Sequence, residues 1–289
     1  MTISLMTLNI VGEMFFKFQM DQDFEGFTET YEEMLDLAKE CGYTSVDVTT
    51  LETMAFTAKG VKERLDARGL KAGSFIYMAN LAAVDEEGYD KRVQDAKAAV
   101  DTALLFGTDI LMLAPQAHEG IENNTPEEIR DSLVKHLMPV VSYAKEKKVH
   151  VVVEDTPDLR LHFCSMEDVK AVLDRVPGLE MVYDSGNMIL VKEDPVTYFR
   201  TFRDKIAHVH IKDMQEADPK AFLADHDVDG RAMTGAPTGT GLIDLDAVMA
   251  AMRETEYDGG VTIEFVVDEA KDYRGTLIRS REFVENRSK

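Results

Sequence analysis

The 289-residue sequence has no tryptophan, two cysteines and eight prolines. Cys41 and Cys164 lie far apart and form no C-x-x-C pair, so they indicate ordinary buried thiols of a reducing compartment and do not point to a disulfide framework. No apolar run approaches the ~20 residues that a membrane-spanning helix needs. The N-terminal segment lacks the basic and apolar regions of a secretory signal peptide. We therefore expect a cytoplasmic protein with no membrane partner.

Positive charge is also scarce. Lysine and arginine total 32 against 54 aspartates and glutamates, which gives a formal net charge of −22. A surface this acidic repels phosphate backbones, so nucleic acid is a poor partner. Hydrophobic residues make up 45% of the chain, enough to build a large core. The length suits one barrel domain of ~250 residues with a few long loops.

Short apolar segments alternate with longer amphipathic segments from end to end. The segments expected as strands are 2–10, 45–50, 71–78, 109–115, 150–156, 180–186, 206–213 and 260–266. Those expected as helices include 27–42, 60–69, 90–107, 125–148, 165–177 and 244–255. Eight strands with intervening helices predict an α/β fold, a (β/α)8 TIM barrel in which residues 1–289 form a single domain. The alternative is an open doubly wound sheet, which rarely needs eight such regular units.

The longest irregular segment, residues 214–241, follows the seventh expected strand. A loop of this length in a compact domain is usually a lid or a binding segment, although a tolerated surface insertion is the alternative. In a barrel the segment would lie over the C-terminal face, where barrel enzymes carry out their chemistry. We therefore expect a long functional loop there.

Side chains that can bind a metal stand at or near the ends of the last four expected strands. They are Glu154, Asp184, His210 and Glu264. Taken singly, each is explained as well by a helix cap, an ion pair or a packed core residue. Charged groups at the ends of four consecutive apolar strands need a common reason, because burying a lone carboxylate is costly. Three carboxylates and one imidazole suit Mn²⁺, Mg²⁺ or Co²⁺ and do not exclude Zn²⁺.

Two histidines compete for the imidazole position. His208 and His210 are two residues apart, so their side chains point to the same face of one strand. The histidine nearer the C-terminal end should reach the site, which favours His210 and leaves His208 in a supporting role. Asp47 and Glu52, near the second expected strand, either reach the same pocket or cap the helix that follows.

The motifs VVVEDTP, VYDSGN, HVHIKD and GTGLIDLDAVMAAMRETEYDGGVTIEF follow one another in the second half of the chain. In this order they resemble the xylose isomerase-like TIM barrel superfamily of sugar epimerases and isomerases. The resemblance, which extends over most of the chain, implies one divalent cation, with Mn²⁺ the first choice, bound by Glu154, Asp184, His210 and Glu264. It also implies that Glu154 and Glu264 are the catalytic acid/base pair.

The physical chemistry agrees with what the resemblance implies. A metal chelated by a carbonyl and a neighbouring hydroxyl acidifies the adjacent C–H group and stabilises the cis-enediolate that forms. Two carboxylates on opposite sides of that carbon can remove and return the proton. The expected function is therefore a metal-dependent epimerase or isomerase acting on a sugar, a keto-polyol or a small hydroxy-carbonyl compound.

Four further residues are candidates for substrate binding. Asn187 stands where many members of the superfamily carry a histidine, and its amide can hydrogen-bond a substrate oxygen but is a poor metal ligand. Lys212 could orient a hydroxyl or a carboxylate, or form a surface ion pair with Asp213 or another acid. His118 follows the fourth expected strand, and Arg231 in the long loop could pair with an anionic group. The chain also lacks the arginine that ketose 3-epimerases present shortly after the histidine ligand.

Three rival functions remain at this stage. An inosose-type dehydratase, a lyase, would use the same metal and the same enediolate. An abasic-site endonuclease of this fold resembles a trinuclear zinc protein with a basic surface, which Asn187 and the charge of −22 disfavour. A barrel that binds a metabolite without turnover is the third. A homo-oligomer is compatible with the fold, but no sequence feature establishes one.

Overall fold

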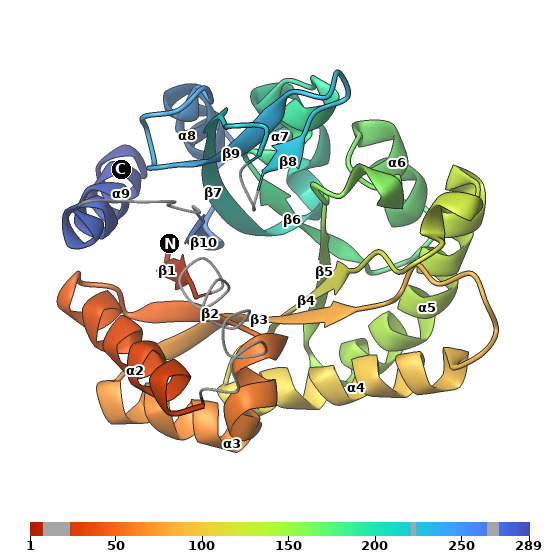
Figure 1. Cartoon of the computed structure of the whole chain (residues 1–289), viewed down its shortest axis with the longest axis horizontal. Coiled ribbons are helices and arrows are strands. Elements are labelled where there is room, and N and C mark those ends of the chain that lie inside the picture. Colours follow the sequence, from red (N-terminus) through yellow and green to blue (C-terminus); the bar gives the residue numbers. More distant parts are fainter. Residues whose placement is uncertain (8–23, 221–223, 265–271) are drawn as a thin grey trace.

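A computed structural model of the chain describes residues 1–7, 24–220, 224–264 and 272–289. In these residues a central barrel of parallel strands is surrounded by helices (Figure 1). The barrel strands are β1 (Ile3–Met6), β2 (Ser45–Thr49), β3 (Lys71–Ala79), β4 (Ile110–Pro115), β5 (His150–Glu154), β6 (Glu180–Asp184), β7 (Ile206–Glu216) and β10 (Gly260–Glu264). Each begins within two residues of its expected position.

Strand pairing closes the barrel. Each strand from β1 to β6 pairs in parallel with the next, and β10 pairs in parallel with both β7 and β1. The predicted eight-stranded (β/α)8 barrel is thus confirmed, and the doubly wound sheet is excluded, because an open sheet has no pairing between its first and last strands. The parts of the first and last expected strands at 8–10 and 265–266 lie outside the described residues.

The surrounding helices are α2 (Phe24–Glu40), α3 (Thr50–Arg68), α4 (Tyr89–Phe106), α5 (Pro126–Lys147), α6 (Met166–Leu173), α7 (Pro195–Phe202), α8 (Leu245–Glu254) and α9 (Tyr273–Arg287). Of these, α7 and α9 were not among the expected segments, and α3 begins ten residues earlier than expected. Thr49 and Glu52 form a capping box that starts α3 directly after β2. A kink at Thr57, whose φ is 61°, divides the helix, and the expected segment 60–69 lies after it.

The segment 214–241 is not an irregular loop throughout. Strand β7 continues to Glu216 and pairs antiparallel with β9 (Ala232–Ala236), which pairs in turn with the short β8 (Asp225–His226). The turn between β8 and β9 is held by Asp227, whose Oδ1 accepts hydrogen bonds from the N–H groups of Asp229 and Arg231. Such Asx turns are local hydrogen-bonding features that hydrophobic periodicity does not detect.

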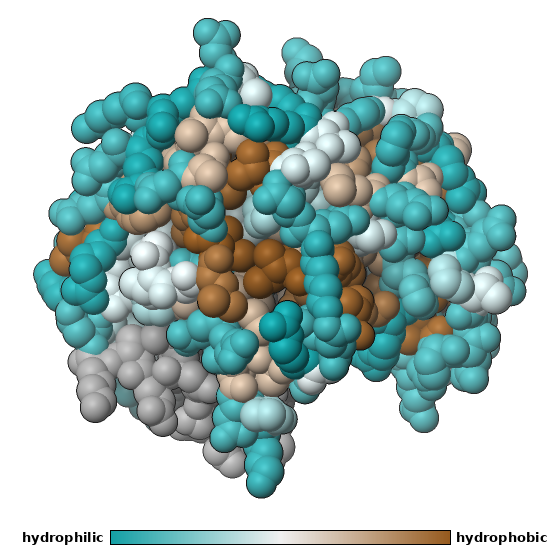
Figure 2. Space-filling view, turned by 90° about the horizontal axis from the view of Figure 1, so that it is seen from above, coloured by the Kyte–Doolittle hydropathy of each residue, from teal (hydrophilic) through white to brown (hydrophobic). Residues whose placement is uncertain are grey.

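Apolar residues fill two regions. The larger core lies between the strands and the helices, and a smaller cluster inside the barrel consists of Met6, Ile76, Met112, Val152 and Val182. Hydrophilic side chains cover most of the face shown in Figure 2, as the acidic composition requires. In the described part of the chain, no helix is both long and apolar enough to span a membrane.

Candidate metal centre

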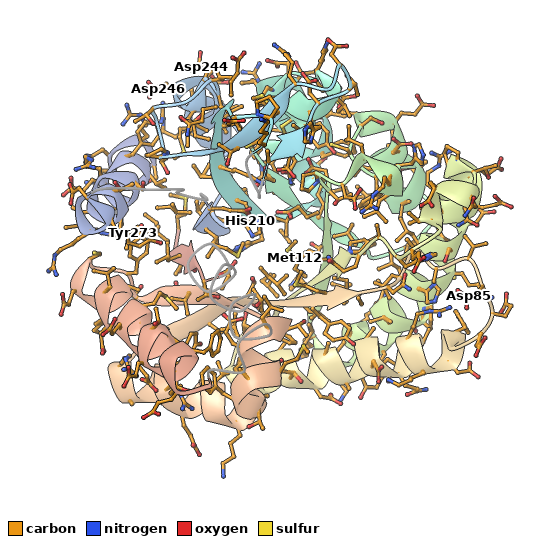
Figure 3. The ribbon with its side chains drawn as sticks, viewed as in Figure 1. Asp85, Met112, His210, Asp244, Asp246 and Tyr273 are labelled. Carbon is orange, nitrogen blue, oxygen red and sulfur yellow. The ribbon has the colours of Figure 1, made fainter. Side chains whose placement is uncertain are left out.

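The four side chains expected to bind a metal meet inside the C-terminal end of the barrel. Glu154 ends β5, Asp184 ends β6, Glu264 ends β10, and His210 projects from β7. One ligand atom from each lies within 4.8 Å of those of the other three. In Figure 3, His210 and Met112 lie in the barrel interior, whereas Asp85 and Asp244 lie at the periphery. Residues 30, 26 and 54 positions apart in sequence therefore share one site.

The hydrogen bonding of this cluster fits a cation. His210 Nδ1 lies 2.5 Å from Glu154 Oε1 and 3.2 Å from Glu264 Oε2. These short contacts are not hydrogen bonds. Four buried atoms of the cluster have no hydrogen-bond partner among the described residues: Glu154 Oε1, Asp184 Oδ2 and both nitrogens of His210. Unpaired buried polar atoms are costly. An oxygen-rich set of such atoms with one imidazole is a donor set for Mn²⁺, Mg²⁺ or Zn²⁺.

The backbone orients one of these ligands. Asp184 Oδ1 accepts hydrogen bonds from the N–H groups of Gly186 and Asn187, at 2.8 Å and 2.7 Å. Both donors lie in the turn that directly follows β6, so the tight turn DSGN fixes the carboxylate. Oδ2 is consequently left to face the other three side chains.

Burial and neighbouring charges set the ionisation of the cluster. Burial raises the pKa of Asp184 to about 7, with Glu264 and Glu154 adding to the rise and Lys212 opposing it. Burial alone would also raise the pKa of Glu264, but the charges of Lys212 and His210 outweigh it and lower that pKa to about 2. Lys212 remains protonated, because Glu264 and Asp184 raise its pKa against the effect of burial.

In the metal-free protein, the contribution of Asp184 to stability should therefore fall as the pH rises towards neutral. The folded-state pKa of Asp184, about 7, lies above its ordinary value of 3.8, so the folded state binds this proton more tightly than the unfolded state does. The resulting stability is complete below about pH 4 and is lost as the pH rises to about 7. We expect the urea midpoint of EDTA-treated protein to fall over this range relative to that of Asp184→Asn. Parallel pH profiles for the two proteins would contradict this.

A cavity of about 240 Å³ opens beside the cluster. One wall carries charged and amide groups, from Glu154, Asn187, Lys212 and Glu264. The lining also includes apolar side chains, from Met6, Ile76, Met78, Met112 and Leu161. A larger hollow of about 460 Å³ at the opposite end of the barrel contains none of the four candidate ligands. The smaller cavity is therefore the one that can hold a substrate next to the cluster.

Two of the four substrate-binding candidates line this cavity. Lys212 Nζ donates a hydrogen bond to Asn187 Oδ1 at 3.0 Å and lies 3.3 Å from Glu264 Oε1. Asn187 Nδ2 donates to the backbone oxygen of Asp155 at 2.7 Å, which fixes the amide. Lys212 is buried, with 7% of its side chain exposed, so it does not form the surface pair with Asp213 that was the alternative.

The structure does not bring the other two candidates into the cavity wall. His118 Nδ1 lies 2.8 Å from the backbone oxygen of Glu119, and Arg231 donates from Nε to Asp227 Oδ2 in the β8–β9 turn. In their place, Gln116 and Asp158 line the cavity. Both follow the ends of barrel strands, β4 and β5, which is the same signal that identified Glu154.

Comparisons with known proteins agree with the barrel fold. The family model described as xylose isomerase-like TIM barrel matches residues 35–285. An inosose dehydratase from Lacticaseibacillus casei is 26% identical over 263 residues, covering 84% of each chain. The crystal structure of an IOLI protein with a binding zinc atom has a TM-score of 0.71 at 18% identity, covering 100% of this chain and 96% of that one. D-allulose 3-epimerase from Methylomonas sp., in complex with D-allulose, has a TM-score of 0.70 at 17% identity, covering 99% and 97%.

Proposed function

Because the chain belongs to the xylose isomerase-like TIM barrel family, we propose that it is a divalent-metal-dependent epimerase or isomerase of a sugar or a related polyhydroxy ketone. The observation that carries the proposal is the meeting of Glu154, Asp184, His210 and Glu264 beside a cavity at the C-terminal end of the barrel. The same end of the barrel carries the chemistry in other barrel enzymes.

We assign proton transfer to the two glutamates. Glu154 and Glu264 come from strands that do not neighbour each other, and both line the cavity. A cation held by the four side chains would polarise a substrate carbonyl and stabilise the negative charge that develops on it. In our proposal one glutamate removes the proton from the carbon next to that carbonyl and the other returns a proton. If the proton returns to the opposite face of the same carbon, the product is an epimer. If it is added to the former carbonyl carbon, the product is an isomer.

Lys212 and Asn187 would hold the oxygens of the substrate. The ammonium group has three N–H donors, of which one is used by Asn187, and it remains positively charged beside Glu264. A substrate hydroxyl can accept a hydrogen bond from one of the remaining N–H groups. The apolar side chains in the lining would contact the C–H groups of the same molecule.

A dehydratase is the second candidate, because the matched inosose dehydratase is similar over 84% of both chains. In that reaction one glutamate would remove the same C–H proton. The electron pair would form a C=C bond as the β-hydroxyl leaves, and the other glutamate would protonate the hydroxyl to give water. The product mass separates the two candidates, since epimers and isomers keep the mass of the substrate and a dehydratase product loses one water.

Removal of the metal tests both candidates together. We expect EDTA-treated protein to lose its activity on the responsive substrate in a panel of ketoses, inososes and hydroxypyruvate, and to regain it with Mn²⁺. The unfolding midpoint should also rise when the metal is restored, because a ligand that binds the folded state alone stabilises it. Full activity in protein whose metal content has been measured as negligible would exclude a metal-dependent mechanism.

A further inference from the structure

A buried polar cluster lies beneath His210 and has no part in the mechanism proposed above. Asp47, His208 and Thr262 belong to β2, β7 and β10, and all three are buried. Strand β2 neighbours neither β7 nor β10, so hydrogen bonds from Asp47 to these strands cross the inside of the barrel. Barrel interiors are usually packed with branched apolar side chains. A polar cluster in that position needs an explanation.

The two nitrogens of His210 face different surroundings. Nδ1 faces the carboxylates of Glu154 and Glu264, whereas Nε2 lies 3.6 Å from Asp47 Oδ2. Neither nitrogen has a hydrogen-bond partner among the described residues. A neutral imidazole has one N–H donor and one acceptor nitrogen. If Nδ1 is the ligand atom, the proton must be on Nε2, on the side of Asp47.

We propose that Asp47 is a positioning residue that accepts the Nε2–H of His210 and thereby presents Nδ1 to the cation. The inference rests on the metal site of the proposed function. A movement of about half an ångström would bring the two atoms to ~3.0 Å, an ordinary N–H···O distance. Metal-binding histidines generally donate their second N–H to a carboxylate or a carbonyl, which fixes the tautomer and the ring orientation.

The surroundings of Asp47 hold its carboxylate in place for this role. Thr262 Oγ1 donates to Asp47 Oδ2 at 2.7 Å, and His208 Nε2 lies 3.2 Å from the same oxygen. The His208 ring stands perpendicular to that of His210, with 5.5 Å between centroids. On the other side, a Cβ atom at Gly73 would lie 2.5 Å from Asp47 Oδ1, so glycine at that position of β3 leaves the space that Asp47 needs.

Zinc affinity tests the proposal without using activity. We expect Asp47→Ala to bind Zn²⁺ about 10- to 100-fold more weakly than the wild type in competition with a chromophoric chelator, the usual cost of removing such a carboxylate. Asp47→Asn keeps the volume of the side chain, and its zinc affinity should lie between those of Asp47→Ala and the wild type. Ser45→Ala is the matched control, because Ser45 lies on the same strand as Asp47 and its buried hydroxyl bonds to that of Ser4, with no hydrogen bond to either histidine among the described residues. Its zinc affinity should equal that of the wild type.

Three results would overturn the proposal. In one, folded Asp47→Ala and Asp47→Asn bind Zn²⁺ as tightly as Ser45→Ala does. In another, the wild type binds two equivalents and the Asp47 variants bind one, because Asp47, His208 and His210 would then be ligands of a second ion. The third needs no Asp47 variant: ¹⁵N spectra of zinc-loaded wild type, assigned with His210→Gln, show zinc on Nε2. A wild type that binds no Zn²⁺ would instead count against the proposed function itself.

Discussion

Glu154→Gln and Glu264→Gln are each expected to lower kcat by about 10²- to 10⁴-fold, the usual contribution of a positioned acid or base. Glutamine keeps the size of the side chain and one oxygen, but it cannot accept or donate the transferred proton. Both glutamates line the cavity next to the His210 imidazole. The measurements are steady-state turnover and incorporation of solvent deuterium into the substrate, and both should fall together.

The metal content of each variant must be measured, because both glutamates are also proposed as ligands. Asp184→Asn provides the comparison, since we expect it to lose metal and activity together without removing either glutamate. Glu180→Gln is the matched control. Glu180 begins β6 at the opposite end of the barrel, where it lies 2.5 Å from His150 Nδ1, and its loss should leave turnover unchanged. If metal-loaded Glu154→Gln and Glu264→Gln both turn over at the wild-type rate, the acid/base assignment is wrong.

The barrel could be predicted from the sequence because its signals are local and repeated. Each strand is a short apolar segment, and each helix an amphipathic one, so eight repetitions leave few alternatives. The four candidate ligands could be predicted for the same reason. Glu154, Asp184 and Glu264 each end a strand, and parallel strands of a barrel end at the same face. Their meeting in space follows from the topology alone.

The support of the site could not be predicted in the same way. Asp47 and His208 are 161 residues apart on strands that do not pair, so their contact depends on which interior positions of the barrel share a layer. Hydrophobic periodicity specifies the face on which a residue lies but not its neighbour across the interior. The sequence also does not show that Arg231, a candidate to pair with an anionic group, donates from Nε to Asp227 in the β8–β9 turn.

Asp213 illustrates the same limit, since in the sequence it is one more acid at the end of a strand. In the structure it is buried and accepts four backbone N–H groups: Oδ1 accepts from Met214 and Ile243, and Oδ2 from Gly239 and Gly241. All four bonds are 2.8–3.1 Å long, and the three from Gly239, Gly241 and Ile243 attach the segment before α8 to β7. The carboxylate therefore stabilises the connection between the last two barrel strands.

Asp213→Ala is expected to destabilise the protein by about 2–5 kcal/mol, because it leaves the buried N–H groups of Met214 and Ile243 unpaired at a cost of about 1–3 kcal/mol each, whereas the part-buried N–H groups of Gly239 and Gly241 can turn to water. Asp213→Asn should destabilise the protein less than Asp213→Ala does, but it should remain destabilising, since its amide group turns two donors towards N–H groups that are themselves donors.

Asp244→Ala is the control. Asp244 caps α8 from an exposed position a short distance along the same segment, with Oδ1 accepting from the N–H of Ala247, and such a cap contributes about 1 kcal/mol. The measurement is the urea midpoint of the metal-loaded proteins. If Asp213→Ala unfolds at the same urea concentration as Asp244→Ala, the four hydrogen bonds contribute no more than one exposed helix cap, and the attachment of this segment has another origin.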